Sequence, residues 1–195
     1  ENKCITNNWE LTINLNKQFN KELEEFDFLI ATSNSIKHKD NLEKYPTEHL
    51  KIVGSGSFQS ELENHVTTSN IQNVSFLGAK KPEELIELYA CAKFTIVPSE
   101  ILESYGNVIL ESFAFNKTVI ISDLLGIKNE VAKNKSGLIF PHGNVLKLAE
   151  SIERLLTDAD LKKELEENAA KYVRNFSFEN HFKNLLIIYK KVLQK

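Results

Sequence analysis

The sequence predicts an α/β fold, in which a Rossmann-like, doubly wound parallel sheet of six strands has helices on both faces and is followed by extra C-terminal helices. Short apolar or β-branched runs alternate with helical patterns from Phe26 onward, which is typical of βαβ units. After residue 141, only helical periodicity remains. The 195 residues, of which 42% are hydrophobic and 26% charged, are enough to bury the core of such a domain.

Six segments have the composition of strands buried on both faces, because each is short and apolar. The expected strands are residues 26–33, 49–56, 73–79, 93–99, 118–122 and 136–141. Helical patterns fill the intervals, and Pro82 followed by two glutamates is a favourable helix start. The expected helices are residues 37–45, 58–69, 82–92, 105–115 and 127–134.

Three apolar stripes at helical spacing follow the sixth strand, and we expect all three to pack in the core. They are Leu148, Ala149, Ile152, Leu155 and Leu156, then Leu161, Leu165, Ala169 and Val173, then Phe178, Phe182, Leu185, Leu186, Tyr189 and Leu193. The first 20 residues are rich in asparagine and fit neither pattern. We therefore expect an N-terminal extension of uncertain structure over residues 1–20 and one domain over residues 21–195.

Charge and cysteine content argue against several classes of function. The net charge of −3 gives no overall attraction to nucleic acid or to an anionic membrane. Cys4 and Cys91, the only cysteines, lie far apart, which argues against a disulfide framework or a zinc site and fits a reducing cytoplasm. No run is long and apolar enough for a membrane span, and the first residues lack the pattern of a signal peptide.

Ligands of a doubly wound sheet bind at the carboxyl ends of its strands, where helix N-termini attract phosphate. The first loop at that edge, residues 31–41, contains Lys37, His38 and Lys39. These cations either neutralise a diphosphate or form an exposed, solvated basic loop.

Two further loops at this edge contain glycine. Gly54 and Gly56 follow the second strand and allow either a close backbone approach to a ligand or a plain strand-to-helix turn. They lack the third glycine of the dinucleotide fingerprint and the Gly-Lys-Ser/Thr of a P-loop. Gly78, Ala79 and Lys80 follow the third strand and either frame a nucleobase or make a turn.

The run ESYGNVILE (103–111) carries the sharpest signal. Glu103 falls in the loop after the fourth strand, Gly106 near the start of the next helix, and Glu111 about one turn inside it. Backbone N–H groups at Gly106 could approach phosphate oxygens, while the two carboxylates could accept hydrogen bonds from polyols on either side. A diphosphate flanked by two sugars has this polarity. The alternative is structural, with Glu103 as a capping or surface residue and Glu111 paired with a lysine.

The histidines carry weaker signals. We expect His142 in a turn, and His65 and His181 on helices where they are partly packed. No Ser-His-Asp order or metal-ligand cluster stands out, so we expect no metal site.

A succession of motifs from about Leu50 to Leu193 resembles one family. The motifs are KIVGSGSFQSELE, VSFLGAKKPEELIELYACAKFTIVPS, ESYGNVILE, SFAFNKTVIISDLLGIKNEV, SGLIFPHGNVLKLAESIERLL and FSFENHFKNLLIIYKKVL. In this order they are similar to the C-terminal, donor-binding domain of the GT-B glycosyltransferases of family 4 (glycosyl transferases group 1), a retaining, sugar-nucleotide-dependent group. ESYGNVILE matches the family's E-x7-E motif. The resemblance implies one half of a GT-B fold.

The resemblance also implies roles for the site residues. Glu103 would contact hydroxyls of the donor sugar, and Glu111 would hold the ribose hydroxyls. The backbone from Ser104 through Tyr105 and Gly106 to Asn107 would bind the sugar and the diphosphate. The remaining nucleotide-binding positions would be Gly54, Gly56, Gly78, Ala79 and Lys80. The nucleotide sugar would be a substrate rather than a cofactor, with a UDP-sugar favoured.

Lys37 stands at the place of the family's phosphate lysine and would stabilise charge on the departing nucleoside diphosphate. The family has a Gly-Arg run five residues earlier, where this chain has Ala31-Thr32. His38 or Lys39 could supply the positive charge of the missing arginine.

Two other departures from the family pattern are visible. Asn116 and Thr118 replace Gly and Pro, which is a mild change at the first position because Asn tolerates the left-handed conformation. The N-terminal acceptor domain is almost wholly missing, and the chain contains no methionine, so we expect a piece of a longer product.

Three functions therefore compete. The first is the donor-binding half of a retaining glycosyltransferase, which transfers a hexosyl group to a glycan or lipid-linked acceptor in polysaccharide biosynthesis and is inactive without its acceptor domain. The second is a non-catalytic module that binds a nucleotide sugar or a partner protein. The third is another GT-B enzyme, such as a sugar-nucleotide epimerase. We expect no nucleic-acid partner and a cytoplasmic location, with peripheral contact at the inner face of the membrane as an alternative.

Overall fold

The structure is a computed structural model that describes residues 26–31, 48–56 and 59–193. Its parallel strands form one sheet in the order β3-β2-β1-β4-β5-β6. The strands are β1 (Phe26–Ala31), β2 (Leu50–Val53), β3 (Val74–Gly78), β4 (Ala92–Val97), β5 (Val119–Ser122) and β6 (Gly137–Phe140). The strand order reverses between β1 and β4, as in a doubly wound sheet. The predicted α/β class is therefore confirmed.

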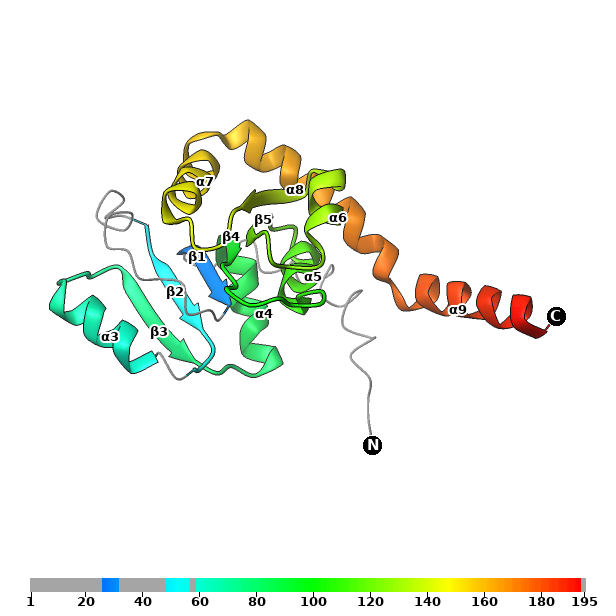
Figure 1. Cartoon of the computed structure of the whole chain (residues 1–195), viewed down its shortest axis with the longest axis horizontal. Helices are drawn as coiled ribbons and strands as arrows, with labels where there is room; N and C mark the ends of the chain where they lie inside the picture. Colours follow the sequence, from blue (N-terminus) through cyan, green and yellow to red (C-terminus); the bar gives the residue numbers. More distant parts are fainter. Residues whose placement is uncertain (1–25, 32–47, 57–58, 194–195) are drawn as a thin grey trace.

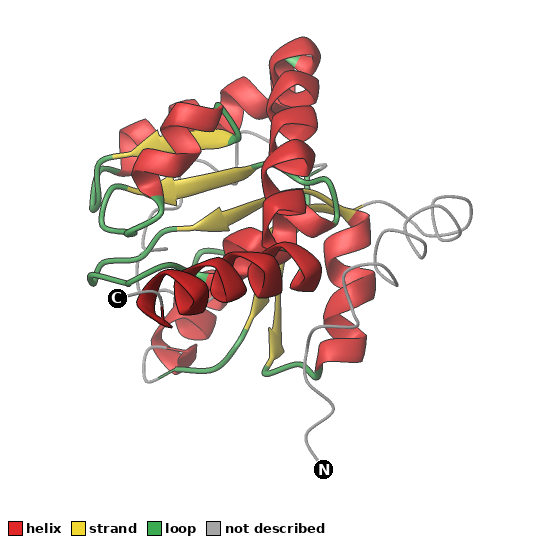
Figure 2. Ribbon diagram, turned by 90° about the vertical axis from the view of Figure 1, so that its right-hand side faces the viewer, coloured by secondary structure: helices red, strands yellow, loops and turns green. Residues whose placement is uncertain are grey.

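Helices cover both faces of this sheet (Figures 1 and 2). They are α3 (Gln59–Thr68), α4 (Pro82–Cys91), α5 (Asn107–Ala114), α6 (Lys128–Asn134), α7 (Val145–Thr157), α8 (Ala159–Val173) and α9 (Phe178–Leu193), with the 3-10 turn η2 (Arg174–Phe176) between the last two. One core cluster includes side chains of α4, α5 and α6, and a second includes side chains of α7. Helix α8 contributes to both, because Leu165 belongs to the second cluster and Ala169 to the first.

Strand β5 shows how the sequence produces these layers. All of its residues are buried. Val119 and Ile121 belong to the cluster that contains α5, while Ile120 belongs to the cluster that contains α7. Successive side chains of a strand point to opposite faces, so a strand covered on both sides has a continuous apolar sequence.

Helix α5 is shorter than the predicted helix over residues 105–115, and backbone conformation explains both ends. Gly106 precedes it with φ 78°, and a residue in the left-handed region cannot continue a right-handed helix. Beyond its C-terminal end, Asn116 has φ 57°. Asn116, which stands where the resembled family has glycine, thus adopts the left-handed conformation that it was expected to tolerate.

The prediction that the third apolar stripe packs in the core is wrong. None of the α9 side chains is buried within the described part of the chain. Phe182 is 48% exposed and Leu193 is 83% exposed. Figure 1 shows α9 extending away from the sheet towards the C-terminal end. Periodicity shows that one side of a helix is apolar, but it does not show that another element covers that side.

Some predictions fall outside the described residues. They concern the extension over residues 1–20, the helix over residues 37–45, and the basic residues Lys37, His38 and Lys39. In the three described ranges, no helix is long and apolar enough to cross a membrane.

Candidate functional site

The candidate site lies where the strands end. Figure 2 shows loops leaving the strands along one edge of the sheet. Strand β4 ends at Val97 and α5 begins at Asn107, so Glu103 lies in the connection between them. Glu111 lies on α5 itself, a little more than one turn from its start. Both glutamates therefore follow the carboxyl end of β4, as predicted, and doubly wound sheets bind their ligands at this edge.

The carboxylate of Glu103 is bonded within its own loop. The Ser99 hydroxyl donates a hydrogen bond to Glu103 Oε1. Ser99 is buried, and its carbonyl oxygen accepts a hydrogen bond of 2.7 Å from Ser122 Oγ at the end of β5. The carbonyl oxygen of Glu103 accepts a hydrogen bond of 2.9 Å from the backbone N–H of Gly126. Two strand ends therefore hold the loop around Glu103.

Glu111 is bonded to a different part of the sheet. The Tyr89 hydroxyl on α4 donates to Glu111 Oε2 at 2.8 Å. Tyr89 is buried and stacks on Phe115 with ring centroids 5.5 Å apart. Burial, together with the Glu111 carboxylate, raises the pKa of Tyr89 far above its usual range, so the phenol remains a donor. The partner of Glu111 is thus a tyrosine, not the lysine of the structural alternative.

Both carboxylates keep an acceptor atom for a ligand. Among the described residues, Oε2 of Glu103 and Oε1 of Glu111 have no hydrogen-bond partner. Gly106 lies between the two residues at the start of α5, where backbone N–H groups attract anions. The chain therefore has one such carboxylate oxygen before and one after a helix start whose backbone N–H groups can attract an anion.

The side chains between the two glutamates have separate positions. Ser104 and Asn107 are exposed. Tyr105 is half-buried, with its hydroxyl 3.2 Å from that of Tyr172 and its ring centroid 6.1 Å from that of Phe176. The predicted role of residues 104–107 was a backbone role, and the side chain of Tyr105 instead joins the loop to α8 and η2.

The two glycine loops lie beside each other. The backbone N–H of Gly54, the residue after β2, donates to the carbonyl oxygen of Gly78 at 2.8 Å, and Gly78 is the last residue of β3 and pairs with Val53. Gly54 has φ 118° and Gly78 has φ 65°. A Cβ atom at Gly56 or Gly78 would meet nothing within 4 Å. These loops combine turn conformations with open space around the backbone.

Lys80 is part of the start of α4. Its ammonium group lies 3.0 Å from Glu84 Oε1, and the backbone N–H of Lys81 donates to Glu84 Oε2 at 2.9 Å. These contacts lower the pKa of Glu84, mainly through the Lys81 N–H. The Lys80 side chain is therefore paired with Glu84, while the neighbouring Ala79 is exposed.

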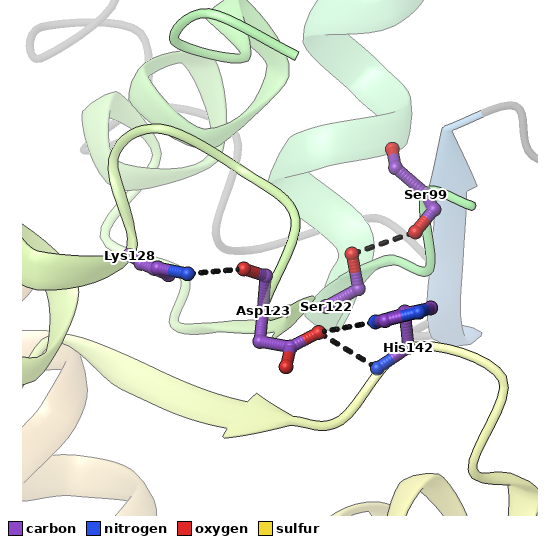
Figure 3. A network of polar contacts seen from close by, with 5 residues as sticks. All are labelled: Ser99, Ser122, Asp123, Lys128 and His142. Atoms are coloured by element: carbon purple, nitrogen blue, oxygen red, sulfur yellow. Dashed lines mark hydrogen bonds and ion pairs between the residues drawn. The ribbon is translucent and has the colours of Figure 1, made fainter. Parts of the chain in front are cut away.

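A polar network links the ends of β5 and β6 (Figure 3). Asp123 Oδ1 accepts the backbone N–H of His142 at 2.8 Å and lies 2.9 Å from the His142 ring Nδ1. The Lys128 ammonium donates to the carbonyl oxygen of Asp123 at 2.6 Å. The backbone N–H of His142, followed by its ring, lowers the pKa of Asp123. His142 lies in a turn, as predicted, and it also anchors the loop after β5.

Sequence reasoning missed four residues of this region, namely Ser99, Ser122, Asp123 and Gly126. Ser99 and Ser122 are the last residues of the fourth and fifth predicted strands, and Asp123 and Gly126 follow the fifth, so their position at the carboxyl edge of the sheet was the only available signal. Within the described ranges, no group of three or more His, Cys, Asp or Glu side chains is placed to hold a metal ion. Lys37 lies outside those ranges.

Comparison with solved structures shows which fold the chain has. Sucrose-phosphate synthase from Thermosynechococcus elongatus matches with a TM-score of 0.71 and 24% identity, covering 93% of this chain and 49% of that one. Anabaena HepE in complex with UDP and glucose matches with a TM-score of 0.70 and 20% identity, covering 93% and 52%. The chain therefore has the fold of one half of the GT-B glycosyltransferases.

Sequence comparison identifies the family within this class. The profile described as Glycosyl transferases group 1 matches residues 22–172, so the chain belongs to that family. D-inositol 3-phosphate glycosyltransferase from Corynebacterium urealyticum is 31% identical over 157 residues, which cover 76% of this chain and 37% of the relative. An uncharacterized glycosyltransferase from Methanocaldococcus jannaschii is 30% identical over 131 residues, covering 67% and 37%. The chain spans little more than a third of the length of these relatives.

Proposed function

We propose that the chain is the donor-binding half of a retaining glycosyltransferase that transfers a hexosyl group from a nucleoside diphosphate sugar to a glycan or lipid-linked acceptor. The observation that carries this proposal is the pair of carboxylates around Gly106. Glu103 and Glu111 each have one oxygen bonded and one without a partner among the described residues, on either side of a helix start. A diphosphate between two polyols matches that sequence of groups.

Each residue then has a distinct task. Oε2 of Glu103 accepts a hydrogen bond from a hydroxyl of the donor sugar, and Glu111 accepts hydrogen bonds from the ribose. Tyr89 keeps the Glu111 carboxylate in place because it occupies the other oxygen. The backbone at the start of α5 binds the diphosphate, and Lys37 supplies the cation that stabilises negative charge on the leaving group. The glycine loops with Gly54, Gly56, Gly78, Ala79 and Lys80 bind the nucleotide through their backbone.

UDP is the favoured nucleotide of the proposed donor. HepE of Anabaena, whose fold is shared, was crystallised with UDP and with UDP-glucose. The acceptor would bind to a domain outside this chain, and transfer would require that domain. We further propose a cytoplasmic location, at the inner face of the membrane if the acceptor is lipid-linked.

A non-catalytic module is the second candidate. It is favoured by Ala31-Thr32, where the resembled family has a Gly-Arg run. Such a module would bind a nucleotide sugar or a partner protein without transferring the sugar.

The proposal is tested first by titration calorimetry of the chain with UDP, GDP, ADP and their glucose conjugates. We expect Glu111→Gln to weaken binding of the preferred nucleotide by about tenfold or more, since a hydrogen bond to a charged group is lost. Glu150→Gln is the matched control, because Glu150 is an exposed residue of α7 that pairs with Lys147. Absence of binding to every member of the panel would contradict the proposal.

Transfer is tested with the full-length gene product. We expect it to hydrolyse or transfer from the nucleotide sugar that the chain binds best, and Glu103→Gln to reduce that turnover. Tight binding with no turnover over a broad acceptor panel would instead favour the non-catalytic module.

A further inference from the structure

The loop that carries Glu103 is held from two sides. Its backbone is bonded to the loop after β5, through the hydrogen bond of 2.9 Å from the Gly126 N–H and an isolated parallel bridge between Glu103 and Leu125. Its carboxylate is bonded to Ser99 near the end of β4. The two contacts come from different strand ends and act on different parts of the same residue.

Gly126 is a position where a side chain does not fit. A Cβ atom there would lie 2.0 Å from the carbonyl oxygen of Ser104 and 3.0 Å from its carbonyl carbon. Gly126 is not among the described residues with positive φ, so its backbone conformation does not require glycine. Close approach of two backbones does require it, since a methyl group would push residues 103 and 104 away.

Ser99 holds the carboxylate from a rigid position. Ser99 and Ser122 are both buried, and the Ser122 hydroxyl fixes the Ser99 carbonyl group at 2.7 Å. The Ser99 hydroxyl therefore has a defined position from which it donates to Glu103 Oε1. Because Oε1 is held by Ser99, the orientation of the carboxylate also sets the direction in which Oε2 points.

Glu111 is not held by Ser99 or Gly126. It lies on α5 and is bonded to Tyr89 of α4. A displacement of residues 103 and 104 would consequently move the proposed sugar contact and leave the proposed ribose contact in place.

We propose that Ser99 and Gly126 are positioning residues for Glu103 and set the preference of the site for an intact nucleotide sugar over the free nucleoside diphosphate. This inference rests on the proposed function, in which Glu103 binds the donor sugar and Glu111 binds the ribose. Neither Ser99 nor Gly126 touches the ligand, and both act through the orientation of Glu103.

The test measures a ratio of affinities by calorimetry. The probes are UDP-, GDP- and ADP-glucose with their nucleoside diphosphates, and the pair that the wild-type chain binds best is used for the variants. We expect Gly126→Ala to weaken binding of the nucleotide sugar by about tenfold or more, as for a lost hydrogen bond to a charged group, with a change of less than about threefold for the diphosphate.

Gly137→Ala is the matched control for the added methyl group. Gly137 begins β6, and a Cβ atom there would lie 2.6 Å from the carbonyl oxygen of Val119 at the start of β5. This clash also involves a backbone carbonyl group, but it lies at the opposite ends of the strands. We expect Gly137→Ala to lower thermal stability and to keep the wild-type affinity ratio.

Ser99→Ala removes the hydroxyl that donates to Glu103 without adding volume. It tests the positioning role on its own if Gly126→Ala does not fold. We expect the same selective loss of the nucleotide sugar. An unchanged affinity ratio in Ser99→Ala or in folded Gly126→Ala would overturn the positioning role, as would an equal loss of both ligands. A wild-type chain that binds the two ligands equally well would also overturn it. Failure of the wild-type chain to bind any nucleotide would overturn the proposed function itself.

Discussion

Glycines lie at the carboxyl ends of strands in both halves of the sheet, but for different physical reasons. After β4 and β5 they are crowded: a Cβ atom would lie 2.9 Å from Leu125 Cδ2 at Gly106, and 2.0 Å from the Ser104 carbonyl oxygen at Gly126. After β2 and β3, a Cβ atom at Gly56 or Gly78 would meet nothing within 4 Å. The loops after β4 and β5, here called the crowded half, use glycine to bring segments together, whereas the loops after β2 and β3, here called the open half, leave space beside the backbone.

This difference matches the tasks proposed for the two halves. The crowded half holds Glu103 in one orientation, which a site needs if it is to recognise particular sugar hydroxyls. The open half would accommodate a nucleotide through backbone groups, for which space is needed more than a fixed side chain. A glycine in a motif can therefore allow either close packing of two segments or open space beside the backbone. Only its neighbours in space show which of the two applies.

The largest effect on stability in this comparison is expected at Gly106. Gly106→Ala places a side chain at φ 78° and against the buried side chains of Leu125 and Ile109. The left-handed conformation and the overpacking together should lower the free energy of unfolding by about 3 kcal/mol. Urea denaturation measures this. A loss below about 1 kcal/mol would show that the crowded half adapts easily and would break the distinction.

A smaller effect is expected at Gly78. Gly78→Ala adds a methyl group in open space at φ 65°, so only the backbone conformation is penalised, by about 1 kcal/mol. Gly56→Ala is the control, since its position is open and its φ is not in the left-handed range, and it should change stability by less than about 0.5 kcal/mol. Equal losses at the two positions in urea denaturation would contradict this reading.

The smallest effect concerns Asp123, which links the loop after β5 to the turn after β6. Hydrogen bonds from His142 lower its pKa, so this carboxylate stabilises the fold above the usual aspartate pKa, and the contribution is lost as pH falls through the lowered value. Asp123→Asn should therefore be slightly less stable than wild type at neutral pH. The difference should shrink below about pH 4. Denaturation curves at both pH values test this, and a difference that grows in acid would be the wrong sign.

The sequence predicted the two glutamates of the site but not their supports. Glu103 and Glu111 are separated by a spacing that can be read along the chain, and they fall in the loop and in the helix that follow one apolar strand. Ser99 is a donor to Glu103 because of the local fold of its loop, and Gly126 approaches Ser104 from another strand end. The structural alternative placed a lysine beside Glu111, whereas its partner is Tyr89, which is 22 residues away in sequence.

Helices α8 and α9 show the same limit for the core. Both have apolar stripes at helical spacing, and both were expected to be packed. Leu165, Ala169 and Val173 of α8 are buried, whereas every described side chain of α9 remains at least partly exposed. Periodicity is a property of one segment, while burial depends on whether a second surface reaches it.

The sequence by itself therefore determined the alternation of strands and helices, the class of sheet, and the place of the two glutamates after the carboxyl end of the fourth strand. These features follow from side-chain periodicity and from local signals such as Gly106. Only the tertiary structure decided which glycines are crowded, which residues hold Glu103 and Glu111, and which apolar helix is covered. Those outcomes depend on contacts between segments distant in the chain, and no local pattern specifies the distance between two backbones.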